Sequence, residues 1–171
     1  ENTFYGFNGS YFQTVYLTPG LGFWVRASSD GTVYLSGIGR STKVSSFMDV
    51  NIPEDNKLVF SNGEGYVTTL VVGGSTADDP LSYGLPPVPP AGAFDVRFSG
   101  DLKYAENGGE ILIRNDHYPL TIDYEGACLI EEEAEWILVN TESGQKFAMC
   151  EGQAVIHSSV SELLLTKRTV V

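Results

Sequence analysis

Apolar and polar residues alternate along most of the chain in short segments separated by turn residues. A period of two places successive side chains on opposite faces, which is typical of β-strands with one buried face. Asp30-Gly31, between two such segments, is a strong hairpin signal. No segment keeps a helical period, so Ile130–Trp136 is predicted as a loop or a single helical turn despite its helix-forming residues. The predicted strands are Tyr11–Leu17, Gly22–Ala27, Thr32–Ile38, Lys43–Val50, Lys57–Phe60, Tyr66–Val72, Phe94–Ser99, Glu110–Arg114, Leu120–Tyr124, Trp136–Asn140, Lys146–Cys150, Ala154–His157 and Leu163–Lys167.

A cluster of prolines interrupts this pattern near the middle of the chain. Five of the eight prolines lie between positions 80 and 90. Proline fixes φ and favours an extended, semi-rigid conformation, which is typical of a spacer between domains. We therefore predict an all-β protein of two Ig-like β-sandwich modules, at 1–79 and 93–171, joined by a proline-rich linker at 80–92.

Composition and charge narrow the classes of partner. The 171 residues are 42% apolar, enough for a buried core, and the net charge is −12. Nucleic acids and anionic membranes are recognised by clusters of Lys and Arg, so neither is an expected partner. No apolar run approaches the roughly 18 residues of a membrane span. The acidity itself is interpreted as a contribution to solubility.

Several distinctive motifs lie along the chain. The segment Phe4–Tyr11 contains the "FNGSY" pattern, Leu17–Arg26 resembles "L-x-PG-x-GYW", and Asp30–Gly37 resembles a "GT-x-x-LSG" hairpin. Pro86–Phe98 resembles "PP-x-PP-x-G-x-FD-x-RF", and strands containing "YPLT", "W-x-LV" and "L-x-L-x-K" follow it. Together these motifs resemble a region of secreted proteins from the Bacteroidetes/Chlorobi group, and such regions often precede the C-terminal sorting signal of the type 9 secretion system. The resemblance implies a secreted or cell-surface β-protein and carries over no catalytic residue.

This resemblance also implies an assembly role. In such proteins strands normally precede the "FNGSY" segment, so the first module is expected to be incomplete, with an open sheet edge. The sorting signal does not follow Val171, as in a mature, cleaved chain or in part of a longer protein. An open edge accepts a strand from another chain. We expect the partner to be another copy of the chain or the rest of a larger surface protein, or else the chain to be a fragment with well-packed ends. The first candidate segment for strand exchange contains Thr3, Phe4, Tyr5, Phe7, Tyr11 and Phe12, and the second is Leu163–Val171.

The two cysteines, Cys128 and Cys150, lie on predicted strands that could pair. In an exported protein they are expected to form a disulfide, worth about 3 kcal/mol by loop-closure entropy. Buried free thiols are the alternative. Neither cysteine has a histidine or a basic residue nearby in the sequence, so a reactive cysteine is not expected.

Metal-binding and catalytic signals are weak. Asp78-Asp79 and the glutamates of 131–135 could supply oxygen ligands to calcium, but the EF-hand spacing is absent, so solvated acidic loops are the default interpretation. We therefore expect no cofactor, with calcium as the alternative. The adjacency of Asp116 and His117 carries little weight, because neighbours on a strand point to opposite faces. With no nucleophile motif either, the chain is predicted not to be an enzyme.

Aromatic residues of the first half offer a second function. Exposed aromatic rings stack on sugar faces in many β-sandwich modules, although packing in a core is the commoner role of such rings in a sheet. The leading hypothesis is a non-enzymatic extracellular structural or assembly module, with the subunit of a surface filament as one form. The alternative is a carbohydrate-binding or spacer module of a secreted hydrolase that binds polysaccharide. The candidate sugar-stacking residues are Tyr11, Tyr16, Trp24 and Tyr34.

Overall fold

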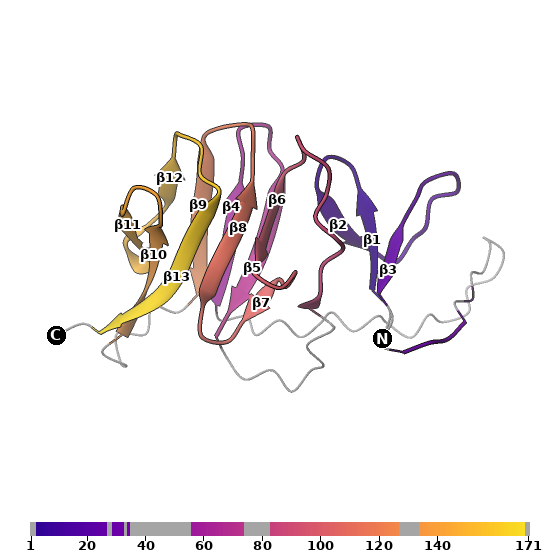
Figure 1. Ribbon diagram of the computed structural model, residues 1–171, viewed down its shortest axis with the longest axis horizontal. Helices are drawn as coiled ribbons and strands as arrows, with labels where there is room; N and C mark the ends of the chain where they lie inside the picture. Colours follow the sequence, from indigo (N-terminus) through magenta and orange to yellow (C-terminus); the bar gives the residue numbers. More distant parts are fainter. Residues whose placement is uncertain are drawn as a thin grey trace.

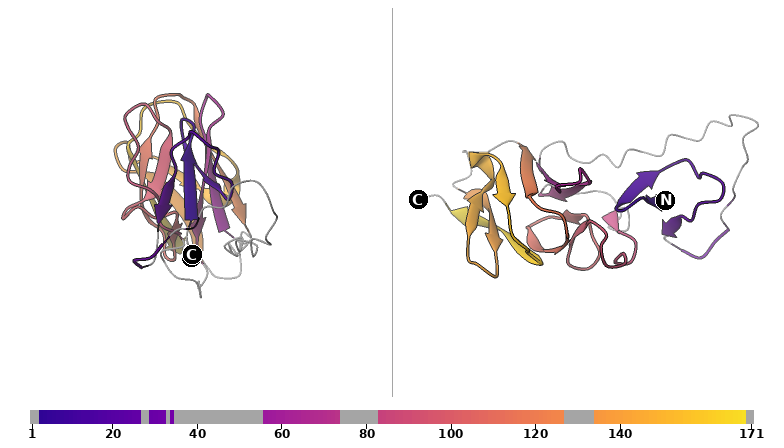
Figure 2. Two further views of the ribbon diagram at one scale, coloured as in Figure 1. Left: turned by 90° about the vertical axis from the view of Figure 1, so that its right-hand side faces the viewer. Right: turned by 90° about the horizontal axis from the view of Figure 1, so that it is seen from above.

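The computed structural model describes residues 3–26, 29–32, 34, 56–73, 83–126 and 134–169. These residues form thirteen strands and one short 3₁₀ turn, which confirms the all-β prediction. The strands belong to three antiparallel or mixed sheets, two of which face each other as a sandwich (Figure 1). The third sheet lies at one end of this sandwich, opposite the end that carries β10 and β11 (Figures 1 and 2).

The sandwich consists of two five-stranded sheets. One has the order β11-β10-β13-β8-β6 and the other the order β12-β9-β4-β5-β7. The first contains β6 (Asp95–Phe98), β8 (Gly109–Arg114), β10 (Ala134–Asn140), β11 (Lys146–Ala148) and β13 (Glu162–Thr169), and the turn η2 (Met149–Glu151) follows β11. The second contains β4 (Asn56–Ser61), β5 (Val67–Val72), β7 (Tyr104–Ala105), β9 (Leu120–Gly126) and β12 (Ala154–Ile156).

Alternating apolar side chains fill the space between these two sheets. On β4, Leu58 and Phe60 are buried, while on β13 Leu163 and Leu165 are buried and Leu164 between them is exposed. This alternation is the pattern from which the strands were predicted. Most predicted strands of the described residues are confirmed to within two or three residues at each end. Those at Thr32–Ile38 and Lys43–Val50 lie largely or wholly outside the described residues.

The third sheet is small and has the order β2-β1-β3. It consists of β1 (Thr3–Phe7), β2 (Tyr11–Thr14) and β3 (Trp24–Arg26). Tyr5 on β1 is opposite both Gln13 on β2 and Trp24 on β3, so these three side chains share one face of the sheet. That face is directed toward the sandwich, where Tyr5 is buried.

Sheet membership departs from the predicted domain boundary. Strands β4 and β5 precede the proline cluster, but β4 pairs with β9 along six residue pairs and so belongs to the sandwich. The predicted division into 1–79, 80–92 and 93–171 therefore does not coincide with the sheets. The physical reason is that Leu58, Phe60, Leu70 and Val72 need an apolar surface to cover them, and the opposing sheet provides it.

A second difference concerns the predicted loop or helical turn at Ile130–Trp136. Residues 134–136 begin β10, which pairs with β13 from Ala134 to Asn140, so this part of the prediction is wrong. Trp136 pairs with Lys167 and makes a cation–π contact with it, and both interactions favour the extended conformation at this end of β10.

The central position of β13 in its sheet leads to a prediction about the free energy of unfolding. Leu163→Ala should lower the free energy of unfolding by about 2–5 kcal/mol, because it leaves a cavity between the two sheets. Leu164→Ala on the same strand should change it by less than about 1 kcal/mol, because Leu164 is exposed. Urea unfolding followed by circular dichroism measures both variants. Equal losses in the two variants would contradict the assigned faces of β13.

Candidate functional site

The proline-rich segment lies between the small sheet and the sandwich and is hydrogen-bonded to both. From residue 83 it runs between β6 on one side and the β1–β2 hairpin on the other (Figure 1). Proline has no backbone N–H, so this segment offers many carbonyl acceptors and few donors. Its buried carbonyls therefore need donors from neighbouring elements, whereas its exposed carbonyls can also bond water.

Tyrosines of the small sheet supply donors from one side. The Tyr5 hydroxyl donates to the Gly84 carbonyl at 3.3 Å, and the Tyr11 hydroxyl donates to the Pro87 carbonyl at 3.1 Å. The hairpin turn is also attached, because the Phe94 amide donates to the Gly9 carbonyl at 3.0 Å. These bonds fix the inner face of the small sheet against the segment.

Arginines of the sandwich supply donors from the other side. Arg97 on β6 donates from Nη1 to the Pro86 carbonyl at 2.7 Å, and Arg114 at the end of β8 donates to the Pro89 carbonyl at 3.3 Å. The segment predicted to be a spacer is thus hydrogen-bonded to a sheet on each side.

Arg97 is the most deeply buried charged residue among the described residues, with 1% of its surface exposed. It makes a bidentate pair with Asp95 at 2.6 and 2.7 Å and a further bond to Asp101 Oδ1 at 2.8 Å. Burial alone would lower the pKa of Arg97, but the hydrogen bonds and charges of Asp95 and Asp101 outweigh burial and raise it. Arg97 therefore stays charged at every pH at which the protein folds.

Tyr11 lies close enough to this network for its pKa to respond. Burial raises the pKa of Tyr11, the charge of Arg97 opposes this, and the charge of Asp95 adds to it. The net upward shift keeps the hydroxyl protonated, as its bond to the Pro87 carbonyl requires.

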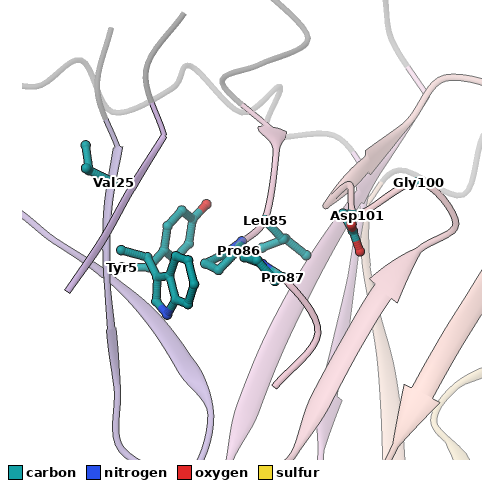
Figure 3. A pocket seen from close by; sticks show the side chains of 8 residues that line it. Tyr5, Val25, Leu85, Pro86, Pro87, Gly100 and Asp101 are labelled. Carbon is teal, nitrogen blue, oxygen red and sulfur yellow. The ribbon is translucent and has the colours of Figure 1, made fainter. Parts of the chain in front are cut away.

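A pocket of about 340 Å³ opens beside this network (Figure 3). Pro86 and Pro87 lie between Tyr5 and Asp101 in this view. Trp24 is 51% exposed, and it brings an accessible ring to the pocket from the edge strand β3. The residues that line the pocket are Tyr5, Trp24, Val25, Leu85, Pro86, Pro87, Gly100 and Asp101.

The turn that presents Asp101 has an unusual backbone. Gly100 has φ 87° and Asp101 has φ 60°, and Asp101 is the only described non-glycine residue with a positive φ. This conformation costs a side-chain-bearing residue about 1–2 kcal/mol, although Asp tolerates it better than most. The bond to Arg97 and the bond from the Leu85 amide to the Asp101 carbonyl at 2.8 Å hold the turn in place.

The predicted sugar-stacking residues are only partly brought together. Trp24 lines the pocket, whereas Tyr11 is half-buried and bonded to Pro87. Tyr16 and Tyr34 are 82% and 89% exposed and do not line this pocket. Sequence reasoning missed Arg97, Asp101 and the two prolines of the pocket. The clustering of prolines was visible, but only the fold shows which donors meet it.

The segment predicted to exchange between copies forms two strands. Thr3, Phe4, Tyr5 and Phe7 belong to β1, and Tyr11 and Phe12 belong to β2. Because β1 is paired on both sides, it is not a spare strand in this structure. The second candidate, Leu163–Val171, overlaps β13, which is likewise central in its sheet and buried in the core.

The other candidate residues are dispersed. Asp78, Asp79, Glu131, Glu132, Glu133 and Cys128 lie outside the described residues, so calcium binding there stays the alternative to solvated loops, and the Cys128–Cys150 disulfide stays a prediction. Cys150 is exposed in the turn η2, and Glu135 pairs with Arg168. His117 lies 3.4 Å from Glu64 at the surface, and His157 is exposed elsewhere. Within the described ranges, no three acidic, histidine or cysteine side chains gather in a way that could hold a metal ion, and no helix could cross a membrane.

Comparisons with known proteins assign no family. No protein-family model matches the chain, and no curated protein and no solved structure matches it. The arguments for function therefore come from the residues and their geometry.

The buried position of Arg97 leads to a stability prediction. Arg97→Met leaves Asp95 buried without its partner and should destabilise the protein by about 3–5 kcal/mol. Arg114→Met is the matched control, because Arg114 also donates to a carbonyl of the segment but is exposed, and it should cost less than about 1.5 kcal/mol. The double variant Asp95→Asn/Arg97→Met should recover part of the loss. Urea unfolding measures all three, and equal costs for Arg97→Met and Arg114→Met would contradict the role of the network.

Lys103 gives the protein a distinctive dependence on pH. Only 8% of Lys103 is exposed. Its carbonyl accepts from the Val71 amide of β5, and its own amide donates to the Tyr83 carbonyl, so its backbone is held between these two segments. Burial lowers the pKa of Lys103 from 10.5 to about 8. Below pH 8 both the folded and the unfolded chain carry the charge, so the full cost of burying it is present. Between about pH 8 and 10.5 the unfolded chain binds more protons, so the free energy of unfolding should rise with pH.

Lys103→Met tests this assignment. The variant should be more stable than the parent at pH 7 by about 1–3 kcal/mol, and the difference should shrink as the pH rises toward 10. Subtracting the two curves removes the opposite effect of Tyr11 and Tyr124, whose raised pKa values reduce stability at high pH. A constant difference from pH 7 to 10, measured by urea unfolding, would show that the Lys103 amine does not titrate in this range.

Proposed function

We propose that this chain is a non-enzymatic structural module that assembles with other copies of itself through its small N-terminal sheet. The observation that carries the proposal is the distribution of exposed apolar side chains. Twelve large apolar residues of the described chain are exposed, and eight of them lie between positions 7 and 34. Exposed apolar residues gathered in one region favour a role in protein–protein contact. The eight are Phe7, Phe12, Val15, Tyr16, Leu21, Trp24, Val25 and Tyr34.

The two edges of the small sheet support the same role. The outer edges of β2 and β3 pair with no other strand among the described residues. Phe12 and Gly6 are opposite each other on the face that is turned away from Tyr5, and the Phe12 ring covers Gly6. An apolar face beside unpaired backbone groups is suited to the addition of a strand from another chain.

Charge favours a second copy as the occupant. The whole chain carries −12, which opposes association of identical molecules. Residues 3–26, however, contain no Asp or Glu, and Arg26 is their only charged residue. Two copies that meet through this segment keep their acidic surfaces apart, so apolar burial is not offset by strong repulsion.

The secreted or cell-surface location is part of the proposal. It rests on the resemblance of the "FNGSY" and "PP-x-PP" segments to regions that precede a type 9 sorting signal. The experiment below does not depend on it.

The exposed rings of Tyr16 and Tyr34 favour carbohydrate binding as a second candidate. Polysaccharide pull-down separates the two functions, because a module that only assembles gives no saturable binding to cellulose, chitin or xylan.

Analytical ultracentrifugation tests the assembly. The parent chain should associate with a dissociation constant that rises at least about tenfold in Phe12→Lys and in Val15→Lys, because each places a charge on the apolar surface. Val67→Lys is the matched control: Val67 is an exposed valine on the sandwich, and its replacement should leave association unchanged. A parent chain that is monomeric at 1 mM (on the order of the weakest specific contacts), or equal effects of Phe12→Lys and Val67→Lys, would overturn the proposal.

A further inference from the structure

The side chains around the pocket carry an unbalanced negative charge. Arg97 contributes one positive charge, while Asp95 and Asp101 contribute one negative charge each, which leaves the trio at −1. Asp95 and Arg97 are buried, but the side chain of Asp101 is 50% exposed and lines the pocket. Arg97 bonds only Oδ1 of Asp101. The net charge of this trio is therefore presented to the pocket through Asp101.

The proline-rich side of the pocket offers few backbone hydrogen-bond donors. Pro86 and Pro87 have no N–H, and the Leu85 amide donates to the Asp101 carbonyl. The Tyr5 hydroxyl donates to Gly84 and accepts from Gln13. This side of the pocket and the Asp101 carboxylate therefore suit a ligand that donates hydrogen bonds.

Trp24 adds an apolar surface that attracts cations. Its ring is half-exposed and lines the same pocket as Asp101 and the two prolines. An indole attracts a cation over its face, and the methylene stem of a long basic side chain packs on aromatic and proline rings. The chain uses a similar contact elsewhere, where Lys167 Nζ lies 4.9 Å from the centre of the Trp136 ring.

We propose that this pocket binds the side chain of an arginine or lysine from an extended segment of a partner polypeptide. The cationic group bonds Asp101, and its stem lies against Trp24 and Pro86. The positive φ of Asp101 is consistent with this role, because the turn keeps a strained conformation that directs a carboxylate to the pocket wall. Trp24 and Val25 belong both to the exposed apolar residues of the small sheet and to the pocket, so separate variants distinguish the two proposals: Phe12 and Val15 do not line the pocket, and Asp101 is not part of the apolar surface.

A titration with short peptides tests the proposal. The probe is acetyl-Ala-Ala-Arg-Ala-Ala-amide, and the control peptide has Gln in place of Arg. The measurement is the NMR signal of the Trp24 indole N–H, with the buried Trp136 as an internal reference, in the Phe12→Lys background to exclude self-association. The Arg peptide should shift the Trp24 signal saturably and bind at least about tenfold more tightly than the Gln peptide.

Three variants assign the contacts. Asp101→Asn keeps the shape, tolerates the positive φ and can still accept from Arg97, so it should fold, yet it should abolish the preference for Arg over Gln. Trp24→Ala removes the NMR probe, so its binding is measured by isothermal titration calorimetry beside the parent, and it should weaken binding of the Arg peptide about tenfold. Tyr16→Ala, an exposed aromatic residue outside the pocket, should leave binding unchanged.

Other outcomes overturn the inference. They are equal binding of the Arg and Gln peptides, an unchanged preference in Asp101→Asn, and no saturable shift with the Arg peptide at 10 mM (on the order of the weakest measurable affinities). A saturable shift with cellobiose or methyl glucoside but not with the Arg peptide would assign the pocket to a sugar instead.

Discussion

The carbonyl groups of a proline-rich segment need donors that the segment itself cannot supply, and this constraint organises the structure. Arg97 donates to a carbonyl of the segment from the sandwich, and Tyr5 and Tyr11 donate to two others from the small sheet. Because the donors come from opposite sides, the hydrogen bonds to the segment's carbonyls also fix the small sheet relative to the sandwich. A proline-rich stretch that would be a semi-rigid spacer in isolation is here a layer between two sheets.

Burial of a guanidinium is costly, and the way the protein offsets this cost determines the chemistry of the pocket. Asp95 neutralises Arg97 from its own strand, two residues away, so this pair is complete within β6. Asp101 is then an additional carboxylate, needed to complete the hydrogen bonding of Nη1 but not to balance the charge. The local excess of negative charge beside Trp24 thus follows from how Arg97 is held.

The local and the long-range features differed in how well the sequence predicted them. Strand positions such as β4, β9 and β13 followed from alternation, because the burial of every second residue is recorded in the residues themselves. The pairing of β4 with β9 could not be predicted, since alternation specifies which face is buried but not which sheet covers it. The proline cluster marked a change of composition, which was interpreted as a boundary between domains.

The site was predictable only in part, for a related reason. Trp24 was identified because an aromatic ring in a short strand is conspicuous, but its neighbours Pro86, Pro87 and Asp101 lie more than 60 positions away. Arg97 was hidden within an alternating segment, FDVRFS, in which an arginine at a polar position suggests an exposed side chain. Its burial depends on the carbonyl of Pro86 and on Asp101, and no local pattern in the sequence records that these groups meet.

The two faces of the small sheet therefore have separate roles. Its inner face is occupied, since Tyr5 and Tyr11 use their hydroxyls on the proline-rich segment. The outer face, with Phe12, and the edges of β2 and β3 are open to another chain. Contact through that face would leave the bonds of the inner face intact, so assembly requires no rearrangement of the Arg97 network. Trp24 of the small sheet and Asp101 of the sandwich both line the pocket, so a partner bound there would touch the small sheet and the sandwich together.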